Sequence, residues 1–191
     1  MQCHSLGFSF DRELYVQTPR REPGIRRIFC YCRPPTIRRG IETALLALNL
    51  VGRQMPDVEF IFAGWDMGDY YFPHEHLNAG VLSLKELPDL YSQCDVGLVI
   101  SFTNLSLLPL ELMACGCAVV SNRGANTEWL INDSNSILPD SSPVAIAEAI
   151  VSILQDTERR TELITSAKAF ANSTSWEVEA DKLHSILNEF S

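Results

Sequence analysis

The sequence lacks the segments that would place it in or across a membrane. No apolar run approaches the roughly 18 residues that a membrane-spanning helix needs. The beginning, MQCHSLGFSFDREL, does not have the basic and then apolar order of a signal peptide. With 46% hydrophobic and 20% charged residues, the 191-residue chain is typical of a globular protein. We expect a cytoplasmic location and no transmembrane segment.

Three motifs that identify common enzymes built from alternating strands and helices are also missing. There is no G-x-G-x-x-G for a dinucleotide, no G-x-x-x-x-G-K-[ST] for a nucleoside triphosphate and no G-x-S-x-G nucleophile elbow. These absences argue against a dehydrogenase, a P-loop protein and a hydrolase with that elbow.

Metal-binding patterns are weak as well. The six cysteines (3, 30, 32, 94, 115 and 117) include two C-x-C pairs but no C-x-x-C, and no histidine lies near those pairs. We expect buried, reduced thiols instead. The residues His74, His76, Asp66 and Asp69 are expected in solvated loops. The sequence therefore predicts no metal site and no cofactor.

Positive charge is scarce except near the beginning of the chain. The formal net charge is −9, which argues against nucleic acid as a partner. Residues 1–39 nevertheless hold eight arginines and three acids, a net of +5, which leaves −14 for residues 40–191. A solvated basic loop is the expectation for Arg20, Arg21, Arg26 and Arg27. By contrast, Arg33, Arg38 and Arg39 follow a strand and lead into a helix, where such turns bind anions.

Short apolar runs alternate with helical patterns along the chain. The runs predict strands at residues 27–32, 58–64, 79–83, 96–101, 118–121 and 136–139. Helical spacing predicts helices at about 41–52, 87–91, 111–116, 143–154, 157–171 and 176–190. Strands that are apolar throughout and separated by helices indicate a parallel sheet covered on both faces. The expected fold class is α/β, with a Rossmann-like parallel sheet of about six strands and helices on both faces.

The chain is expected to form one domain with a leading segment. Residues 1–24, which include Pro19 and Pro23, are predicted to be a tether or hinge entering the domain. Residues 25–191 are predicted to be the domain itself, including the closing C-terminal helix.

Polar side chains follow three of the predicted strands, in CRPPTIRRG, GWDMGD and SFTNLSLLPLE. In open parallel sheets ligands bind beyond the carboxyl ends of the strands. Glu111 stands on the first turn of a helix between two apolar strands, where burying a carboxylate is costly unless a partner uses it. Arginines beside one carboxylate suit a ligand that is anionic at its centre and hydroxylated at its side. A nucleoside diphosphate linked to a sugar fits this description.

The motifs around these residues resemble a known family. PLELMACGCAVVSNRGANTEWL resembles the second half of the two-glutamate donor signature of retaining GT-B glycosyltransferases of family 4, or group 1. YCRPPTIRRGIE resembles the Arg...Lys-Gly segment that grips the diphosphate in that family. LGFSFDRELY is similar to its hinge, and SWEVEADKLHSILNEF to its closing helix. Residues 25–191 would then be the nucleotide-sugar-binding, C-terminal half of a two-domain enzyme.

The resemblance implies roles for particular residues. Glu111 matches the glutamate that binds the nucleoside ribose, Arg33 matches the arginine, and Arg39 takes the place of the lysine. Both arginines would be catalytic, because they would stabilise the departing diphosphate. Thr103 stands where the family has its first glutamate. The full set of predicted donor-binding residues is Arg33, Arg39, Gly64, Val81, Leu82, Thr103, Asn104, Ser106, Leu107, Leu108 and Glu111.

The combination of Tyr-x-Arg-Pro with Ser-Leu-x-Pro-x-Glu-x-Met is similar to the rhamnosyltransferase branch of polysaccharide synthesis. The implied donor is dTDP-rhamnose, transferred with retention to a glycan acceptor that a separate N-terminal acceptor domain binds. The chain alone is expected to bind nucleotide without turnover. A non-catalytic nucleotide-sugar-binding module and half of a sugar-nucleotide epimerase are alternative functions.

Structural roles for the same residues also stay open. Glu111 could cap its own helix, and Arg33 could form a surface ion pair. Arg38 is expected to be a solvated neighbour of Arg39. Core or rim packing is expected for Trp65 and Trp129, and Met113 is expected in the core of its helix.

Overall fold

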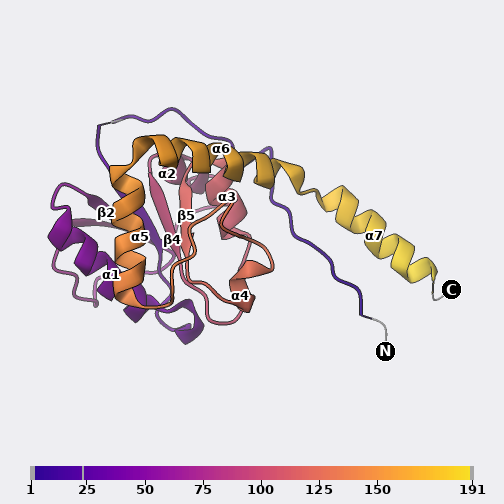
Figure 1. Ribbon diagram of the computed structural model, residues 1–191, viewed down its shortest axis with the longest axis horizontal. Helices are drawn as coiled ribbons and strands as arrows, with labels where there is room; N and C mark the ends of the chain where they lie inside the picture. Colours follow the sequence, from indigo (N-terminus) through magenta and orange to yellow (C-terminus); the bar gives the residue numbers. More distant parts are fainter. Residues whose placement is uncertain (1–2, 23, 190–191) are drawn as a thin grey trace.

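The computed structural model describes residues 3–22 and 24–189 and contains a five-stranded parallel sheet (Figure 1). The strands are β1 (Arg27–Tyr31), β2 (Glu59–Ala63), β3 (His76–Gly80), β4 (Val96–Val99) and β5 (Ala118–Ser121). Their order is β3-β2-β1-β4-β5, and every pair is parallel. The predicted α/β, Rossmann-like fold class is confirmed.

Helices cover both faces of the sheet. One face packs against α1 (Ile41–Gln54) and α5 (Pro143–Gln155), and the other against α2 (Leu87–Ser92), α3 (Leu108–Ala114) and α6 (Thr157–Ser173). Two short helices, η1 (Ile37–Arg39) and α4 (Ala125–Glu128), lie in the connections. This arrangement places a separate apolar core on each side of the strands.

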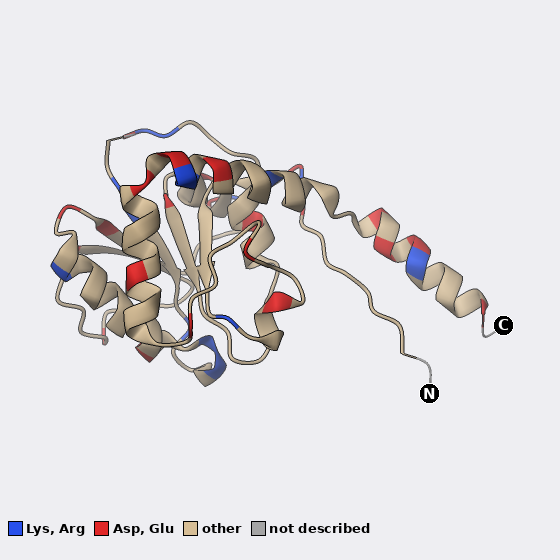
Figure 2. Cartoon of the chain, in the orientation of Figure 1, with Lys and Arg blue, Asp and Glu red and all other residues tan. Residues whose placement is uncertain are grey.

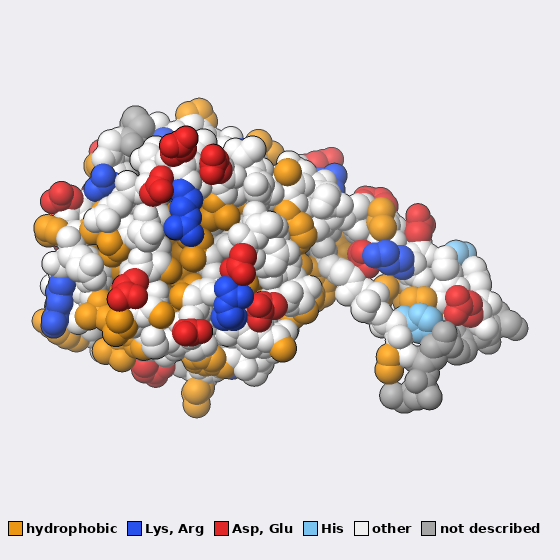
Figure 3. Space-filling view, in the orientation of Figure 1, with side chains coloured by type: hydrophobic (Ala, Val, Ile, Leu, Met, Phe, Trp, Pro, Cys, Tyr) orange, Lys and Arg blue, Asp and Glu red, His pale blue; other side chains and the backbone are white. Residues whose placement is uncertain are grey.

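The last helix, α7 (Trp176–Asn188), projects from the body beside the first residues of the chain (Figure 1). The Gly7 amide donates to Glu179 Oε2 at 2.6 Å. Apolar side chains of α7 such as Val178 and Leu183 are largely exposed, and Figure 3 shows apolar side chains on this projecting part. The predicted helix at 176–190 is present, but residue 190 lies outside the described residues. Among the described helices, none has the length and apolar character to cross a bilayer.

Two predicted strands differ from the structure. The run at 136–139 forms only an isolated bridge between Ile137 and Val120, so the sheet has five strands rather than six. The third strand covers His76–Gly80 and not 79–83, because Gly80 leaves the extended conformation with φ at 61°. Its sequence, HLNAG, mixes polar and apolar residues and is mostly exposed, at the edge of the sheet. Apolar patterning therefore did not reveal its true start.

Residues 9–22 pack against the domain through a buried ion pair. Arg20 donates two hydrogen bonds to Asp95, at 2.7 and 2.9 Å, and the Asp95 side chain is 5% exposed. The Arg27 amide donates to the same carboxylate at 2.9 Å, and Arg160 lies 3.6 Å from it. The position of the domain boundary at residue 24 stays a prediction, and Pro23 lies outside the described residues.

The expectation of a solvated basic loop at residues 20–27 is wrong for two arginines. Arg20 binds Asp95, and Arg27 is nearly buried between Glu22 and Glu59. Arg21 is exposed but pairs with Asp89, and Arg26 is exposed. The sequence pattern did not show three of these acids, because Glu59 comes from β2, Asp95 from the segment after α2 and Asp89 from α2 itself; Glu22 is a local partner of Arg27.

Replacing Asp95 by Asn should lower the free energy of unfolding by about 3 kcal/mol, because Arg20 would keep a largely buried charge without its carboxylate. Urea denaturation measures this loss. The matched change Asp57→Asn, at an exposed aspartate, is the control. Equal stability of the two variants would show that the ion pair does not hold residues 9–22 in place.

Candidate functional site

Two loops leave the carboxyl edge of the sheet side by side, because β1 and β4 are neighbours. The first loop contains η1, and the second runs from residue 100 to 107. The Phe102 amide donates to the Arg38 carbonyl at 2.9 Å. Arg38 Nη1 donates to Asn104 Oδ1 at 3.0 Å and to Thr103 Oγ1 at 3.3 Å. Arg38, expected to be only a solvated neighbour of Arg39, is exposed but joins the two loops.

Gly40 allows this close approach of the loops. Its φ is 57°, in the left-handed region that favours glycine. A Cβ atom at this position would lie 2.5 Å from Ile100 Cγ2 and 2.7 Å from Phe102 Cε2. No other residue fits between η1 and α1 without separating the loops.

Three arginines gather on the first loop without an acidic partner in the described part of the chain. Arg33 and Arg38 are exposed, and Arg39 is half-buried. Figure 2 shows the short helical turn of this loop, η1, in the blue of Lys and Arg. Burial, with the charges of Arg38 and Arg33, lowers the pKa of Arg39. No carboxylate among the described residues forms an ion pair with any of the three. The surface ion pair considered for Arg33 is therefore not found.

One nitrogen of the Arg39 guanidinium lacks a hydrogen-bond partner among the described residues. This atom, Nη1, is buried. The guanidinium carbon lies 6.0 Å from the centroid of the Tyr31 ring, within the range of a cation–π interaction. An anion bound at this cluster would supply the negative charge that the protein does not.

Glu111 lies on the first turn of α3 in apolar surroundings. Burial raises the pKa of this carboxyl group to about 7, although the Tyr15 hydroxyl, as a hydrogen-bond donor, acts in the opposite direction. Burial and the Glu111 charge also raise the pKa of the Tyr15 and Tyr91 hydroxyls above their usual range. The N-cap residue Leu107 makes no side-chain cap hydrogen bond, and Glu111 is the acidic residue in the first turn of α3, so a capping role for Glu111 stays an alternative.

Tyr31 lies near Arg39, and Tyr91 lies in the electrostatic surroundings of Glu111. Tyr31 lies beside the Arg39 guanidinium and is within electrostatic reach of Tyr91. Tyr91 is in turn within electrostatic reach of Glu111. Sequence analysis gave Tyr31 no role at the site, although the quoted segment YCRPP contains it.

The remaining predicted residues border the same edge. Gly64 has φ at 104°, and its amide donates to the Gly80 carbonyl at 2.7 Å. A Cβ at Gly64 would lie 2.5 Å from the Tyr31 ring. Val81 and Leu82 follow β3 directly, Val81 being 79% exposed.

Side chains of the second loop differ in exposure. Exposed or half-buried residues are Thr103, Asn104, Ser106 and Leu107. Leu108 and Met113 are buried in the core, so Leu108 has little surface for a ligand. Trp65 and Trp129 are 40% and 45% exposed, as rim residues would be.

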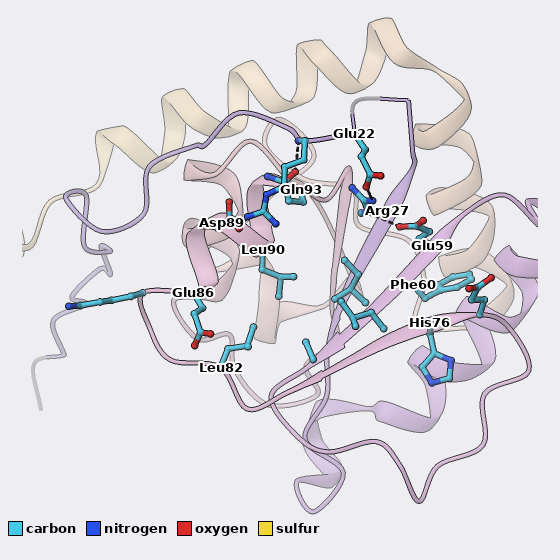
Figure 4. Close-up of a pocket in the computed structure, with 16 residues that line it drawn as sticks. Glu22, Arg27, Glu59, Phe60, His76, Leu82, Glu86, Asp89, Leu90 and Gln93 are labelled. Atoms are coloured by element: carbon cyan, nitrogen blue, oxygen red, sulfur yellow. Dashed lines mark hydrogen bonds and ion pairs between the residues drawn. The ribbon is translucent and has the colours of Figure 1, made fainter.

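A hollow of about 840 Å³ lies elsewhere, between β2, β3 and α2 (Figure 4). Its apolar residues include Ile61, Leu77 and Leu90, and its rim holds the ion pairs of Arg21 and Arg27. Leu82 is the only predicted donor residue that lines it. We therefore place the candidate site at the arginine cluster, where unpaired charges lie, and not in this hollow.

The described residues contain no group of three or more His, Cys, Asp and Glu placed to hold a metal ion. Asp66 instead accepts hydrogen bonds from the Gly68 amide and the Asn78 side chain. His74 lies in a loop but is half-buried beside Phe60, and His76 is exposed but begins β3, so the expected solvated loop is met only in part by each. The cysteines are free, and all except Cys3 are buried, as predicted.

Replacing Gly40 by Ala should lower the free energy of unfolding by about 2 kcal/mol or more, from backbone strain and the clash with Ile100. Gly80→Ala isolates the strain, because φ is 61° but no atom lies within 4 Å, and should cost about 1 kcal/mol. Gly24→Ala, in open space, is the neutral control. Thermal unfolding measures these differences, and a Gly40→Ala variant as stable as Gly24→Ala would refute the close approach of the loops.

Glu111→Gln should stabilise the chain at alkaline pH. The pKa of Glu111 is about 7 when folded, against an ordinary value of 4.5, so the folded state holds the proton more tightly. The stability from this proton is complete below pH 4.5 and is lost as pH rises through 7. At pH 8 the variant should be more stable than the wild type by about 2 to 3 kcal/mol, with near equality at pH 4.5.

Urea denaturation at both pH values measures this difference, and Glu75→Gln, at an exposed position, is the control. A gain of the same size at pH 4.5 and pH 8 would show that ionisation of Glu111 is not its cause.

Comparisons with known proteins agree with this architecture. The family model described as the WsaF C-terminal domain matches residues 26–151. The chain is 37% identical over 172 residues to O-antigen biosynthesis protein RfbC from Myxococcus xanthus. That match covers 86% of this chain but only 14% of RfbC.

Solved structures share the fold at low sequence identity. Sucrose-phosphate synthase from Thermosynechococcus elongatus superposes with a TM-score of 0.79 and 20% identity, over 95% of this chain and 51% of that one. The C-terminal domain of the group 1 glycosyl transferase LpcC from Francisella tularensis superposes with a TM-score of 0.69 and 18% identity, over 87% of this chain and 98% of that one. Anabaena HepE in complex with UDP-glucose superposes with a TM-score of 0.79 and 18% identity, over 96% of this chain and 57% of that one.

The chain thus spans about half the length of two of these structures and a small part of RfbC. Its five-stranded sheet with helices on both faces matches the C-terminal domains of GT-B glycosyltransferases. Since the family model covers about two thirds of the sequence, the chain belongs to the WsaF C-terminal domain family.

Proposed function

We propose that this chain is the donor-binding domain of a glycosyltransferase and holds a nucleotide sugar at the carboxyl edge of its sheet. The observation that carries the proposal is the arginine cluster without acidic partners, in which Arg39 keeps a buried, unpartnered nitrogen. A site that concentrates positive charge and leaves it unpaired is arranged for an anion. The complex of the similar HepE with UDP-glucose supports the choice of anion.

The diphosphate would bind to Arg33 and Arg39. Hydrogen bonds between charged groups contribute roughly 1.5 to 3 kcal/mol each, so two arginines account for most of the affinity. The same residues would stabilise negative charge on the departing diphosphate, which is electrostatic catalysis in a preorganised site. Because the arginines provide this charge, the proposed reaction uses neither a metal nor another cofactor.

The nucleoside and the sugar would take the neighbouring positions. Glu111 would accept hydrogen bonds from ribose hydroxyls, and the exposed Val81 with Gly64 would contact the nucleoside from the β2 and β3 side. Thr103, Asn104 and Ser106, on the exposed second loop, would face the sugar.

We further propose dTDP-rhamnose as the donor and a growing polysaccharide as the acceptor, with retention at the sugar carbon. The motif resemblance favours the sugar, and the name of RfbC, an O-antigen biosynthesis protein, favours polysaccharide synthesis. The reaction would take place in the cytoplasm. A separate acceptor-binding domain is required, since one half of a cleft cannot exclude water or position an acceptor. The chain alone should bind nucleotide without turnover.

Titration calorimetry with dTDP, UDP and GDP tests the proposal. The wild-type chain should bind dTDP most tightly, and Arg33→Ala, Arg39→Ala and Glu111→Ala should each weaken binding at least about tenfold, since each removes a charged hydrogen-bonding group. Thermal unfolding should show that the variants remain folded. The control Arg53→Ala removes an exposed arginine of α1 and should bind as the wild type does. No heat from any nucleotide, or equal affinity of all variants, would refute the assignment.

A further inference from the structure

Side chains from the connection after β5 hold the loop that follows β4. Regular pairing between these two strands ends with Val99 opposite Ser121. Beyond this point, the buried Ser101 amide donates to Asn122 Oδ1 at 2.9 Å, and the side-chain amide of Asn126 donates to the Ser101 carbonyl. Two asparagine side chains therefore pair with the backbone of Ser101 where the neighbouring strand no longer does.

The connection after β5 is itself fixed. Thr127 Oγ1 donates to the Asn122 carbonyl at 2.7 Å, and both residues are buried. Gly124 leaves room for the Asn126 side chain, because a Cβ atom at position 124 would lie 2.5 Å from Asn126 Oδ1. A buried backbone group without a hydrogen-bond partner is costly. The two asparagines therefore hold the backbone of Ser101 in one position.

Ser101 connects this fixed backbone to the loop of the arginine cluster. It is fully buried, and its Oγ donates to the Asn104 carbonyl at 2.5 Å, which closes the turn of the loop. Asn104 Oδ1 in turn accepts from Arg38 Nη1 at 3.0 Å. Between them, the Phe102 amide donates to the Arg38 carbonyl at 2.9 Å. A continuous series of hydrogen bonds thus runs from Asn122 to Arg38.

We propose that Asn122 and Ser101 are positioning residues for the donor sugar, because their hydrogen bonds fix the loop after β4 in the conformation that meets it. This inference rests on the proposed function, in which three residues of that loop face the sugar: Thr103, Asn104 and Ser106. It goes beyond that function because Asn122 and Ser101 lie outside the predicted donor set and are buried beneath the loop. Loss of their hydrogen bonds should weaken binding of a nucleotide sugar more than binding of the nucleotide alone.

The variant Ser101→Ala removes one buried hydroxyl and its hydrogen bond to the Asn104 carbonyl. Ser121→Ala is the matched control, because Ser121 is equally buried and its hydroxyl donates to the Val99 carbonyl at 2.7 Å, outside the loop. Asn122→Ala is a second test, since it removes the acceptor of the Ser101 amide. Thermal unfolding should show that the three variants fold and that the two serine variants lose similar stability.

Hydrogen exchange measured by amide NMR follows the loop without any ligand. The Phe102 amide is bound to the Arg38 carbonyl in the wild type, so its proton should exchange slowly with solvent. In Ser101→Ala and Asn122→Ala it should exchange at least about tenfold faster, because the loop opens more often. Ser121→Ala should exchange as the wild type does. Unchanged exchange in both loop variants overturns the positioning role.

Calorimetry with dTDP, dTDP-rhamnose, UDP and UDP-glucose then tests binding. Ser101→Ala and Asn122→Ala should bind the nucleotide sugar at least about threefold more weakly than the wild type, as expected for a lost hydrogen bond, and should change binding of the free nucleotide less. Ser121→Ala should match the wild type for all four ligands. Equal losses for nucleotide and nucleotide sugar, or no loss for either, overturn the proposal, because reduced stability alone does not distinguish the sugar.

These failures differ from a failure of the proposed function. If Arg33→Ala and Glu111→Ala lose binding while Ser101→Ala and Asn122→Ala match the wild type, the donor site stands and the positioning role does not. If the wild type binds none of the four ligands, the donor site itself is refuted, and the positioning role with it, whatever the exchange of the Phe102 amide shows.

Discussion

The structure of the candidate site depends on one constraint, the fixed contact between the loops that follow β1 and β4. Parallel pairing of these strands starts both loops at the same edge. The hydrogen bond from the Phe102 amide to the Arg38 carbonyl, with the missing side chain at Gly40, then holds them together. Without this contact the loop that carries the arginines would lose its fixed position against the loop that follows β4. The fold thus turns two separate sequence motifs into one surface.

Charged groups of the candidate site have unfavourable electrostatic surroundings that the protein does not offset. Three like charges lie close together without counter-charges among the described residues, and Glu111 is buried enough to resist ionisation. Elsewhere buried charge is compensated, as in the contacts of Asp95 with Arg20 and Arg160. Uncompensated groups concentrated at one edge of an otherwise satisfied fold are typical of a functional site, where a ligand completes the interactions.

Sequence patterns revealed the elements whose burial is uniform and missed those that depend on tertiary contacts. The apolar runs of β1, β2, β4 and β5 led to the correct fold class, and the spacing of α1 and α5 led to the correct layers. The exposed edge strand β3 was placed three residues too late. The partner of Arg20 lies 75 residues away, and that of Glu111 lies in the N-terminal segment, so no local pattern could identify them. Arg33, Arg39 and Glu111 were predicted from their places after strands and from the family resemblance of the motifs, and their roles at the site stay predictions.

A crystal structure of the chain with bound dTDP or UDP tests the central claim most directly. The account predicts diphosphate oxygens within hydrogen-bond distance of the Arg33 and Arg39 guanidinium groups and a ribose hydroxyl on Glu111. A nucleotide in the hollow between β2, β3 and α2, with the arginines untouched, would contradict it.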